Sequence, residues 1–197
     1  MKHTLFISAA IALLFIASCN NPAPSAGDSA TAKMDSAARM RDDKEERNKK
    51  VAMASEAGVN AHDVNAVMKD ASPDFTEYVD GSVPPQKLDS AKHSFAMFLA
   101  AFPDMKGENQ VYVADGDNVI VSSDWTLTFK NDFMGMKATG KTAKFKDVDI
   151  FTFDNNGKVT SHRSIYPFGA MMMMVGCDMS KMPGMDKDMK KDAGKKM

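Results

Sequence analysis

The sequence predicts an α+β domain in which helices come first and a strongly curved antiparallel sheet follows. Two observations carry this prediction. Helix-forming residues and helical spacing of apolar side chains extend to residue 102, whereas from residue 111 apolar and polar residues alternate with a period of two. A Pro/Ser/Ala-rich stretch precedes this region and a Met-rich stretch follows it. The part between them, about 120 residues, is long enough for one compact domain with its own core.

Three helices are expected in the first half. Residues 35–58 are rich in helix formers of mixed charge, and Gly58 supplies a stop. A short helix within residues 61–72 is closed by Pro73, and a third runs from near residue 85 to residue 102. The apolar positions that predict the second and third helices are Val64, Val67, Met68, Leu88, Phe95, Leu99 and Phe102.

Two hairpins are expected in the second half. Residues 111–129 form one around the turn at residues 115–118, and residues 141–165 form the other around residues 154–157. Alternation places one set of side chains of the first hairpin on a common face: Val119, Val121, Ser123, Trp125, Leu127 and Phe129.

The stretch KFKDVDIFTF, residues 144–153, carries two carboxylates on an aromatic face. Alternation puts Asp147 and Asp149 on the same side as Phe145, Phe151 and Phe153. An ionised Asp among Phe rings is costly unless a partner, water or a function compensates for it. Asp149 is therefore a candidate functional residue.

The N-terminus is that of an exported chain. Lys2 is followed by an apolar run and then by small residues directly before Cys19. This arrangement resembles the bacterial lipobox, which implies that residues 1–18 are a signal peptide and that Cys19 is lipidated. Residues 19–45 are then a tether and the start of the first helix. The expected location is the cell envelope, lipid-anchored to the membrane and facing the periplasm.

Residues 46–168 are assigned to the folded domain and residues 169–197 to a Met/Lys-rich tail that is expected to be disordered. The tail allows two interpretations. Soft sulfur ligands from Cys177, Met179, Met182 and Met185 suit Cu(I). A low-complexity extension without a specific role is favoured, because no His accompanies the sulfur atoms.

Composition narrows the function classes. The formal net charge of −1 gives no indication of nucleic-acid binding. The four His residues show neither an i, i+4 pair nor zinc-type spacing to Cys, and no G-x-S-x-G nucleophile motif occurs. We therefore expect no metal and no cofactor in the domain.

Five segments, in order, resemble successive blocks of the SnoaL-like polyketide cyclase and ester cyclase family, within the nuclear-transport-factor-2-like superfamily. They are residues 60–78, 98–105, 113–129, 133–141 and 146–162. The resemblance implies a cone-shaped fold with a deep pocket between a curved sheet and N-terminal helices. It also implies ring closure by an intramolecular aldol reaction without metal or cofactor, and a homodimer through the sheet.

The resemblance further implies that Asp149 is the acid/base residue. His162 is expected to be a catalytic residue beside it. The pocket is expected to be lined by Tyr78, Trp125, Phe145 and Phe151. The sequence departs from many relatives at Tyr78, where they carry His, and at Arg163, where they carry Trp.

The register of the second hairpin leaves the partner of Asp149 open. A four-residue loop at residues 154–157 would set Asp149 opposite His162. A three-residue loop with Gly157 in the left-handed region would set it opposite Arg163.

Two functions follow as expectations. The first is cofactor-free acid/base chemistry on a small apolar carbonyl compound. The second is a non-catalytic ligand-binding or envelope-interaction module, because a fold does not fix a function.

Overall fold

The computed structural model describes residues 26–79 and 84–178. The chain forms two compact units, residues 1–37 and residues 38–197. Helix α1 (Ala26–Asn60) begins in the first unit and ends in the second. The predicted signal peptide and Cys19 lie outside the described residues, as do Met179, Met182 and Met185.

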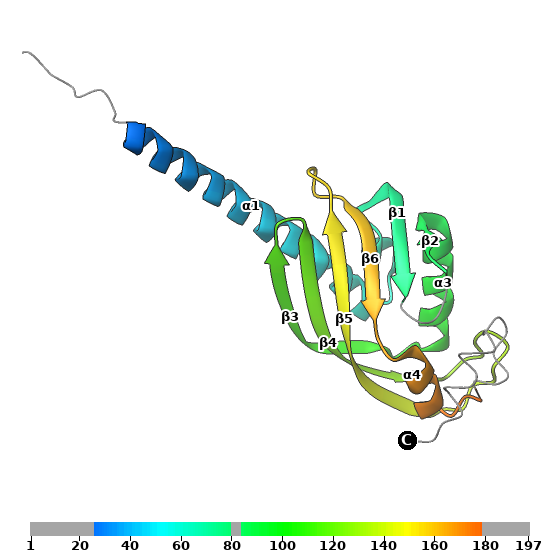
Figure 1. Ribbon diagram of the computed structural model, residues 1–197. Coiled ribbons are helices and arrows are strands. Elements are labelled where there is room, and N and C mark those ends of the chain that lie inside the picture. The colour runs from blue at the N-terminus through cyan, green and yellow to red at the C-terminus, as the bar shows by residue number, and fades with distance from the viewer. Residues whose placement is uncertain (1–25, 80–83, 179–197) are drawn as a thin grey trace, which may run out of the picture. The chain divides into compact units, whose positions relative to one another are not determined.

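The second unit is built on a six-stranded sheet with the order β2-β1-β6-β5-β4-β3. Figure 1 shows these strands side by side in a curved sheet. All neighbouring strands are antiparallel except β1 and β6, which run parallel. The predicted α+β class is thus confirmed, with a mixed rather than a wholly antiparallel sheet. The strands are β1 (Ala71–Val79), β2 (Gln86–Lys87), β3 (Lys106–Asp115), β4 (Asn118–Thr128), β5 (Thr142–Phe153) and β6 (Val159–Ile165).

Helices pack on one face of this sheet. The C-terminal part of α1, the single turn α2 (Val64–Val67), α3 (Leu88–Ala101) and α4 (Phe168–Met174) all contribute residues to two buried clusters. The alternation predicted for β4 is observed, since Val119, Val121, Ser123, Trp125 and Leu127 are buried while their neighbours are more exposed. We call this covered side the inner face of the sheet.

Strand β1 lies where the sequence predicted the end of a helix. Only Val64–Val67 is helical, and the side chain of Asp63 caps that turn by accepting hydrogen bonds from the amides of Asn65 and Ala66 at 2.9 and 3.1 Å. The register of β1 against β6 shifts between Ala71 and Thr76, around Pro73. This irregularity accommodates a proline inside a strand, because proline has no amide hydrogen to donate to the ladder.

Gly58 lies inside α1 and not at its end. A Cβ atom built on Gly58 would stand 2.7 Å from the amide nitrogen of Val67, so glycine lets the end of α1 lie against α2. The same helix begins at Ala26, within the predicted tether.

The predicted tail begins as a packed helix. Met171, Met172 and Val175 are fully buried in the larger core cluster, and Cys177 packs against that cluster. The expectation that the domain ends at residue 168 is therefore wrong, because α4 completes the core. Residues 179–197 of the tail lie outside the described residues.

The second hairpin has a register that neither alternative predicted. Gly157 is left-handed with φ 79°, and Phe153 pairs with Val159, as the three-residue loop requires. A bulge between Thr152 and Phe153 then shifts the register by one residue, so that Asp149 stands opposite Ser164. The bulge turns His162 and Ser164 toward the inner face, and Arg163 pairs with Ile150, whose side chain points the other way.

Among the described residues, no helix combines the length and the apolar character needed to cross a membrane.

Candidate active site

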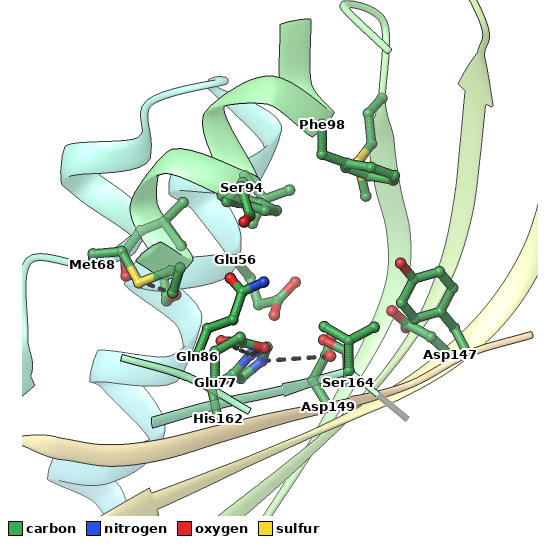
Figure 2. Close-up of a pocket in the computed structure, with 18 of the residues that line it drawn as sticks. Glu56, Met68, Glu77, Gln86, Ser94, Phe98, Asp147, Asp149, His162 and Ser164 are labelled. Atoms are coloured by element: carbon green, nitrogen blue, oxygen red, sulfur yellow. Dashed lines mark hydrogen bonds and ion pairs between the residues drawn. The ribbon is translucent and has the colours of Figure 1, made fainter. Parts of the chain in front are cut away.

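A cavity of about 250 Å³ lies between the inner face of the sheet and the helices. Most of its lining is aromatic or aliphatic, with contributions from α1, α3, β1, β4, β5, β6 and the segment after β6. Figure 2 shows labelled polar side chains converging on this space, with Met68 and Phe98 on different sides of it. An apolar cavity with a few convergent polar groups is the usual form of a small-molecule site.

The polar residues form a diagonal stripe across the inner face. The register pairs Ser123 with Asp147 on β4 and β5, Asp149 with Ser164 on β5 and β6, and His162 with Glu77 on β6 and β1. Each pair is offset by two residues from the one before it, and in a strand a two-residue step keeps a side chain on the same face. The ladder therefore sets these groups in a row on the inner face, and all of them except Ser123 line the cavity.

His162 links two carboxylates. Its Nδ1 lies 2.9 and 3.0 Å from the two carboxylate oxygens of Glu77, to which it donates. Its Nε2 lies 3.4 Å from Oδ1 of Asp149, an ion-pair distance. Neither Nε2 nor that Oδ1 makes a hydrogen bond of normal geometry within the described residues. Glu77 thus fixes the imidazole ring, and the Asp149–His162 edge can still accept a ligand.

The ring of His162 is held in its charged form. Burial by itself lowers the pKa of His162, but the charge of Glu77, the hydrogen bond to Glu77 and the charge of Asp149 raise that pKa well above its ordinary value. At neutral pH the site therefore contains an imidazolium between two acidic side chains.

Glu56 enters the cavity from α1 and is almost fully buried. Its Oε2 accepts a hydrogen bond of 2.9 Å from the amide of Gln110, whose own oxygen accepts one of 2.9 Å from the hydroxyl of Tyr112. Burial, and then the charge of Asp149, raises the pKa of Glu56 to about 8. The group is consequently a neutral acid near pH 7.

Asp147 lies next to Trp125 on the neighbouring strand. Burial, and then the charge of Asp149, raises the pKa of Asp147 to about 8, while the indole N–H of Trp125 acts in the opposite direction. The indole is fixed by Gly107 on β3, because a Cβ atom there would stand 2.7 Å from the six-membered ring. Gly107 is in turn held by Asn60 at the end of α1, through hydrogen bonds to its amide and its carbonyl.

The structure brings together most of the residues that the sequence predicted for the site. Asp149, His162, Trp125, Phe145 and Phe151 all belong to the cavity lining.

Tyr78 does not line the cavity, contrary to the sequence prediction. It pairs with Arg163 on β6, and the guanidinium carbon of Arg163 lies 4.6 Å from the centre of the Tyr78 ring. Alternation along β1 explains this placement, because Phe75, Glu77 and Val79 reach the cavity and Tyr78 between them faces the other way.

Sequence reasoning missed Glu56 and Glu77. Glu56 sits in a helix of mixed charge that carries no apolar stripe to mark its inner side, so its burial had no signal. Glu77 lies on β1, which was not recognised as a strand. Once β1 is recognised, the alternation of Phe75, Glu77 and Val79 would have placed this carboxylate on the inner face.

In residues 26–79 and 84–178, no group of three or more His, Cys, Asp and Glu side chains is placed to hold a metal ion. Cys177 is half-buried, and burial raises the pKa of its thiol. The other proposed sulfur ligands lie outside the described residues, so Cu(I) binding by the tail stays a prediction.

Solved structures support the fold. AclR of Streptomyces galilaeus, described as a candidate hydroxylase, is 24% identical with a TM-score of 0.59, over 67% of this chain and 97% of its own. IdmH of Streptomyces antibioticus, described as a candidate polyketide cyclase, is 20% identical with a TM-score of 0.56, over 66% and 99%. A candidate polyketide cyclase of Acidithiobacillus ferrooxidans is 26% identical with a TM-score of 0.54, over 65% and 96%.

A search of curated proteins gave no match. The model of the SnoaL-like polyketide cyclase family matches residues 49–173, which include every strand, α2, α3 and the polar stripe. Because the match spans more than half of the sequence, the chain belongs to the SnoaL-like polyketide cyclase family.

Proposed function

We propose that the protein binds a small apolar carbonyl compound in the cavity and moves a proton at the carbon next to the carbonyl, as in a cyclisation or an isomerisation. The observation that carries this proposal is the Asp149–His162 edge. Oδ1 of Asp149 and Nε2 of His162 are buried atoms in a largely apolar lining, and neither has a hydrogen-bond partner of normal geometry among the described residues. Buried polar atoms are normally satisfied, and a bound ligand would satisfy these.

In the proposed reaction Asp149 is the general base. Its carboxylate takes the proton from the carbon, the C–H bond breaks, and the electron pair remains on the ligand as an enolate. The enolate carbon then attacks a second carbonyl of the same molecule, and the resulting alkoxide takes the proton back from Asp149. For an isomerisation, Asp149 returns the proton to a different carbon. The proton leaves and returns within one cycle, so the reaction needs neither an electron acceptor nor a hydride donor.

His162 would keep Asp149 in place and balance its charge. Its imidazolium lies 3.4 Å from the base on one side and is fixed by Glu77 on the other. The family to which the chain belongs suggests a role of this kind, either ligand binding or a cyclase or isomerase reaction.

We also propose that the protein works at the cell envelope, with a lipid on Cys19 as its membrane anchor and the domain facing the periplasm. The small residues directly before Cys19 and the apolar run upstream of them support this location. A pocket for apolar compounds near a bilayer suits ligands that partition into lipid.

The proton-transfer proposal can be tested without knowing the natural ligand. The full chain is incubated in D₂O with 2-tetralone, an apolar ketone, and deuterium uptake at the carbons beside the carbonyl is followed by NMR. We expect wild-type protein to accelerate exchange and Asp149→Asn to lose this acceleration by roughly a hundred- to ten-thousand-fold, as is typical when a general base is removed.

The matched control is Asp89→Asn, which makes the same substitution at an exposed position of α3 and should leave exchange unchanged. Exchange that continues in Asp149→Asn would overturn the assignment of the base. Binding of the ketone without exchange dependent on Asp149 would instead identify ligand binding alone as the role of the cavity.

A further inference from the structure

Two buried polar groups that the proposed proton transfer does not use face the same cavity. Oδ1 of Asp147 and Nε1 of Trp125 have no hydrogen-bond partner of normal geometry within the described residues, although their residues are only 8% and 3% exposed. Both residues belong to the cavity lining. Figure 2 shows Asp147 apart from the cluster of Glu56, Glu77 and His162. Such unpaired groups are rare in a protein interior and require an explanation.

The surroundings of Asp147 make it a donor near neutral pH. The titratable groups that face it are Asp149 on the same strand, His162 on β6, Glu56 on α1 and Tyr166 after β6. Burial is the largest influence and the negative charge of Asp149 the next, and together they raise the pKa of Asp147 to about 8. Below that pH the side chain carries an O–H, and a carboxylic acid donates a hydrogen bond that a carboxylate cannot.

The indole N–H of Trp125 can only donate. Its direction is set by close packing, since the ring lies against Gly107, whose missing side chain leaves the space that the ring fills. Asn60 at the end of α1 holds Gly107, because its Oδ1 accepts a hydrogen bond of 2.7 Å from the Gly107 amide and its Nδ2 donates one of 3.1 Å to the Gly107 carbonyl. The indole donor is thus held in place before any ligand arrives.

We propose that Asp147 and Trp125 form a two-donor subsite that binds the carbonyl oxygen of the ligand while Asp149 faces the neighbouring carbon. This inference rests on the proposed function, and it assigns the ligand class more narrowly, as a ketone-type acceptor on an apolar frame. Asp147 and Asp149 are two positions apart on β5, and the Cα atoms of such residues lie about 7 Å apart on one face. An O–C–C–H unit with a contact at each end spans a similar length, so one ligand can meet both residues.

The same contacts would act in the reaction. When Asp149 removes the proton from carbon, negative charge develops on the ligand oxygen, and fixed donors in a cavity from which water is excluded stabilise that charge. Asp149 would then be the base and Asp147 the neutral donor. The two residues lie on one strand, and their different neighbours give them these different roles.

The test is a binding measurement that needs no turnover. Isothermal titration of the detergent-solubilised full chain compares 2-tetralone, which only accepts hydrogen bonds, with tetralin, which has the same frame without the oxygen. At pH 6 we expect wild-type protein to prefer the ketone by about tenfold, the effect of roughly one good hydrogen bond. The preference should fall as the pH rises through about 8, because Asp147 then loses its O–H.

Substitutions separate this subsite from general packing. Asp147→Asn keeps a donor that does not titrate, so the ketone preference should persist from pH 6 to pH 9. Asp147→Leu removes the donor at similar size and should abolish most of the preference. Trp125→Phe keeps an aromatic ring without the N–H and should weaken the ketone preference. Ser123→Ala is the matched control, because Ser123 is buried opposite Asp147 but does not line the cavity.

Absence of a ketone preference in wild-type protein would overturn the proposal, and so would an unchanged preference in folded Asp147→Leu. The outcome is independent of the proton-transfer assay. One combination of results would contradict only this subsite: deuterium exchange that requires Asp149, and a ketone preference that does not depend on Asp147. The proposed function would still hold in that case.

Discussion

The cavity is lined by five ionisable side chains: Glu56, Glu77, Asp147, Asp149 and His162. Ionising all of them in this largely apolar space would destabilise the folded protein. Two of the carboxyl groups, Glu56 and Asp147, avoid the cost by staying protonated, since burial is the largest cause of their raised pKa values. Glu77 and Asp149 instead have the imidazolium of His162 within ion-pair distance. A buried charge without such compensation would cost several kcal/mol.

This arrangement predicts that the domain loses stability as the pH rises from mildly acidic to pH 8. The ordinary pKa values of Glu56 and Asp147 are 4.5 and 3.8, and both values are about 8 in the folded protein. Between these limits the folded chain holds protons that the unfolded chain has released, so the free energy of unfolding falls with pH. The raised pKa of His162 acts with the same sign above about 6.5, the ordinary value for His.

Urea unfolding at pH 5.5 and pH 8 would measure the effect, which we expect to be about 3 kcal/mol from each of the two carboxyl groups in favour of the lower pH. Glu56→Gln and Asp147→Asn should each flatten the dependence. Glu108→Gln is the control, because Glu108 is exposed and its pKa is lowered by Lys106, so it titrates below this window. Equal or greater stability at pH 8 would show that the two carboxyl groups are ionised in the folded protein.

At the level of single residues, the sequence indicated the carboxylates of β5 but not their partners. Alternation along residues 144–153 was sufficient to place Asp149 on an aromatic face, because a two-residue period survives in a regular strand. Its neighbour on β6 depended on a single bulge near Thr152, which shifts every later pair by one residue. The choice between His162 and Arg163 could not be made from loop length alone, since bulges have no reliable sequence signal.

Among the elements, the long strands β4 and β5 were readily predicted and the short or interrupted ones were not. β1 contains Pro73, which ended the predicted helix at Ser72, and the residues after this proline were assigned to no element. α4 is built from a run of four Met residues, and such a run has no contrast between apolar and polar positions from which a period could be read. The tertiary core decides both cases, because only the folded sheet offers the surface that these residues cover.

The packing of α4 gives a prediction for truncated chains. Deleting residues 170–197 removes Met171, Met172 and Val175 from the core, and each large buried side chain that is lost costs about 2–5 kcal/mol. We therefore expect this chain to melt far below wild type or to fail to fold, as measured by circular dichroism. Deleting only residues 179–197 is the matched control and should leave the melting temperature nearly unchanged. Equal melting of the two truncated chains would contradict the role of α4 in the core.

For the whole molecule, the fold does not by itself determine the function. The fold contains a cavity, and the family suggests that it binds a small molecule. The same scaffold supports different reactions, so the chemistry has to come from the residues on the polar stripe. The outer face of the sheet carries exposed Val111, Val113 and Ile120. The predicted homodimer would cover such a face, and it stays a prediction.

The membrane anchor is the prediction that belongs to the full chain. If residues 1–18 are a signal peptide and Cys19 becomes the lipidated first residue, one thiol holds the protein on the bilayer, and acyl chains supply the apolar surface that anchors it. Cys19→Ala should then move the protein from the membrane fraction to the soluble fraction. Mass spectrometry of wild-type protein should find an acylated N-terminal Cys19.

The chain offers a matched control, because it contains two Cys residues and the second, Cys177, packs against the core. Cys177→Ala should stay in the membrane fraction through a salt wash, since it leaves the anchor intact. Salt in the wash would screen an attraction between charged side chains and lipid headgroups, but it would not release acyl chains that are inserted in the bilayer. Retention of Cys19→Ala after the wash would show that another part of the chain holds the protein at the membrane.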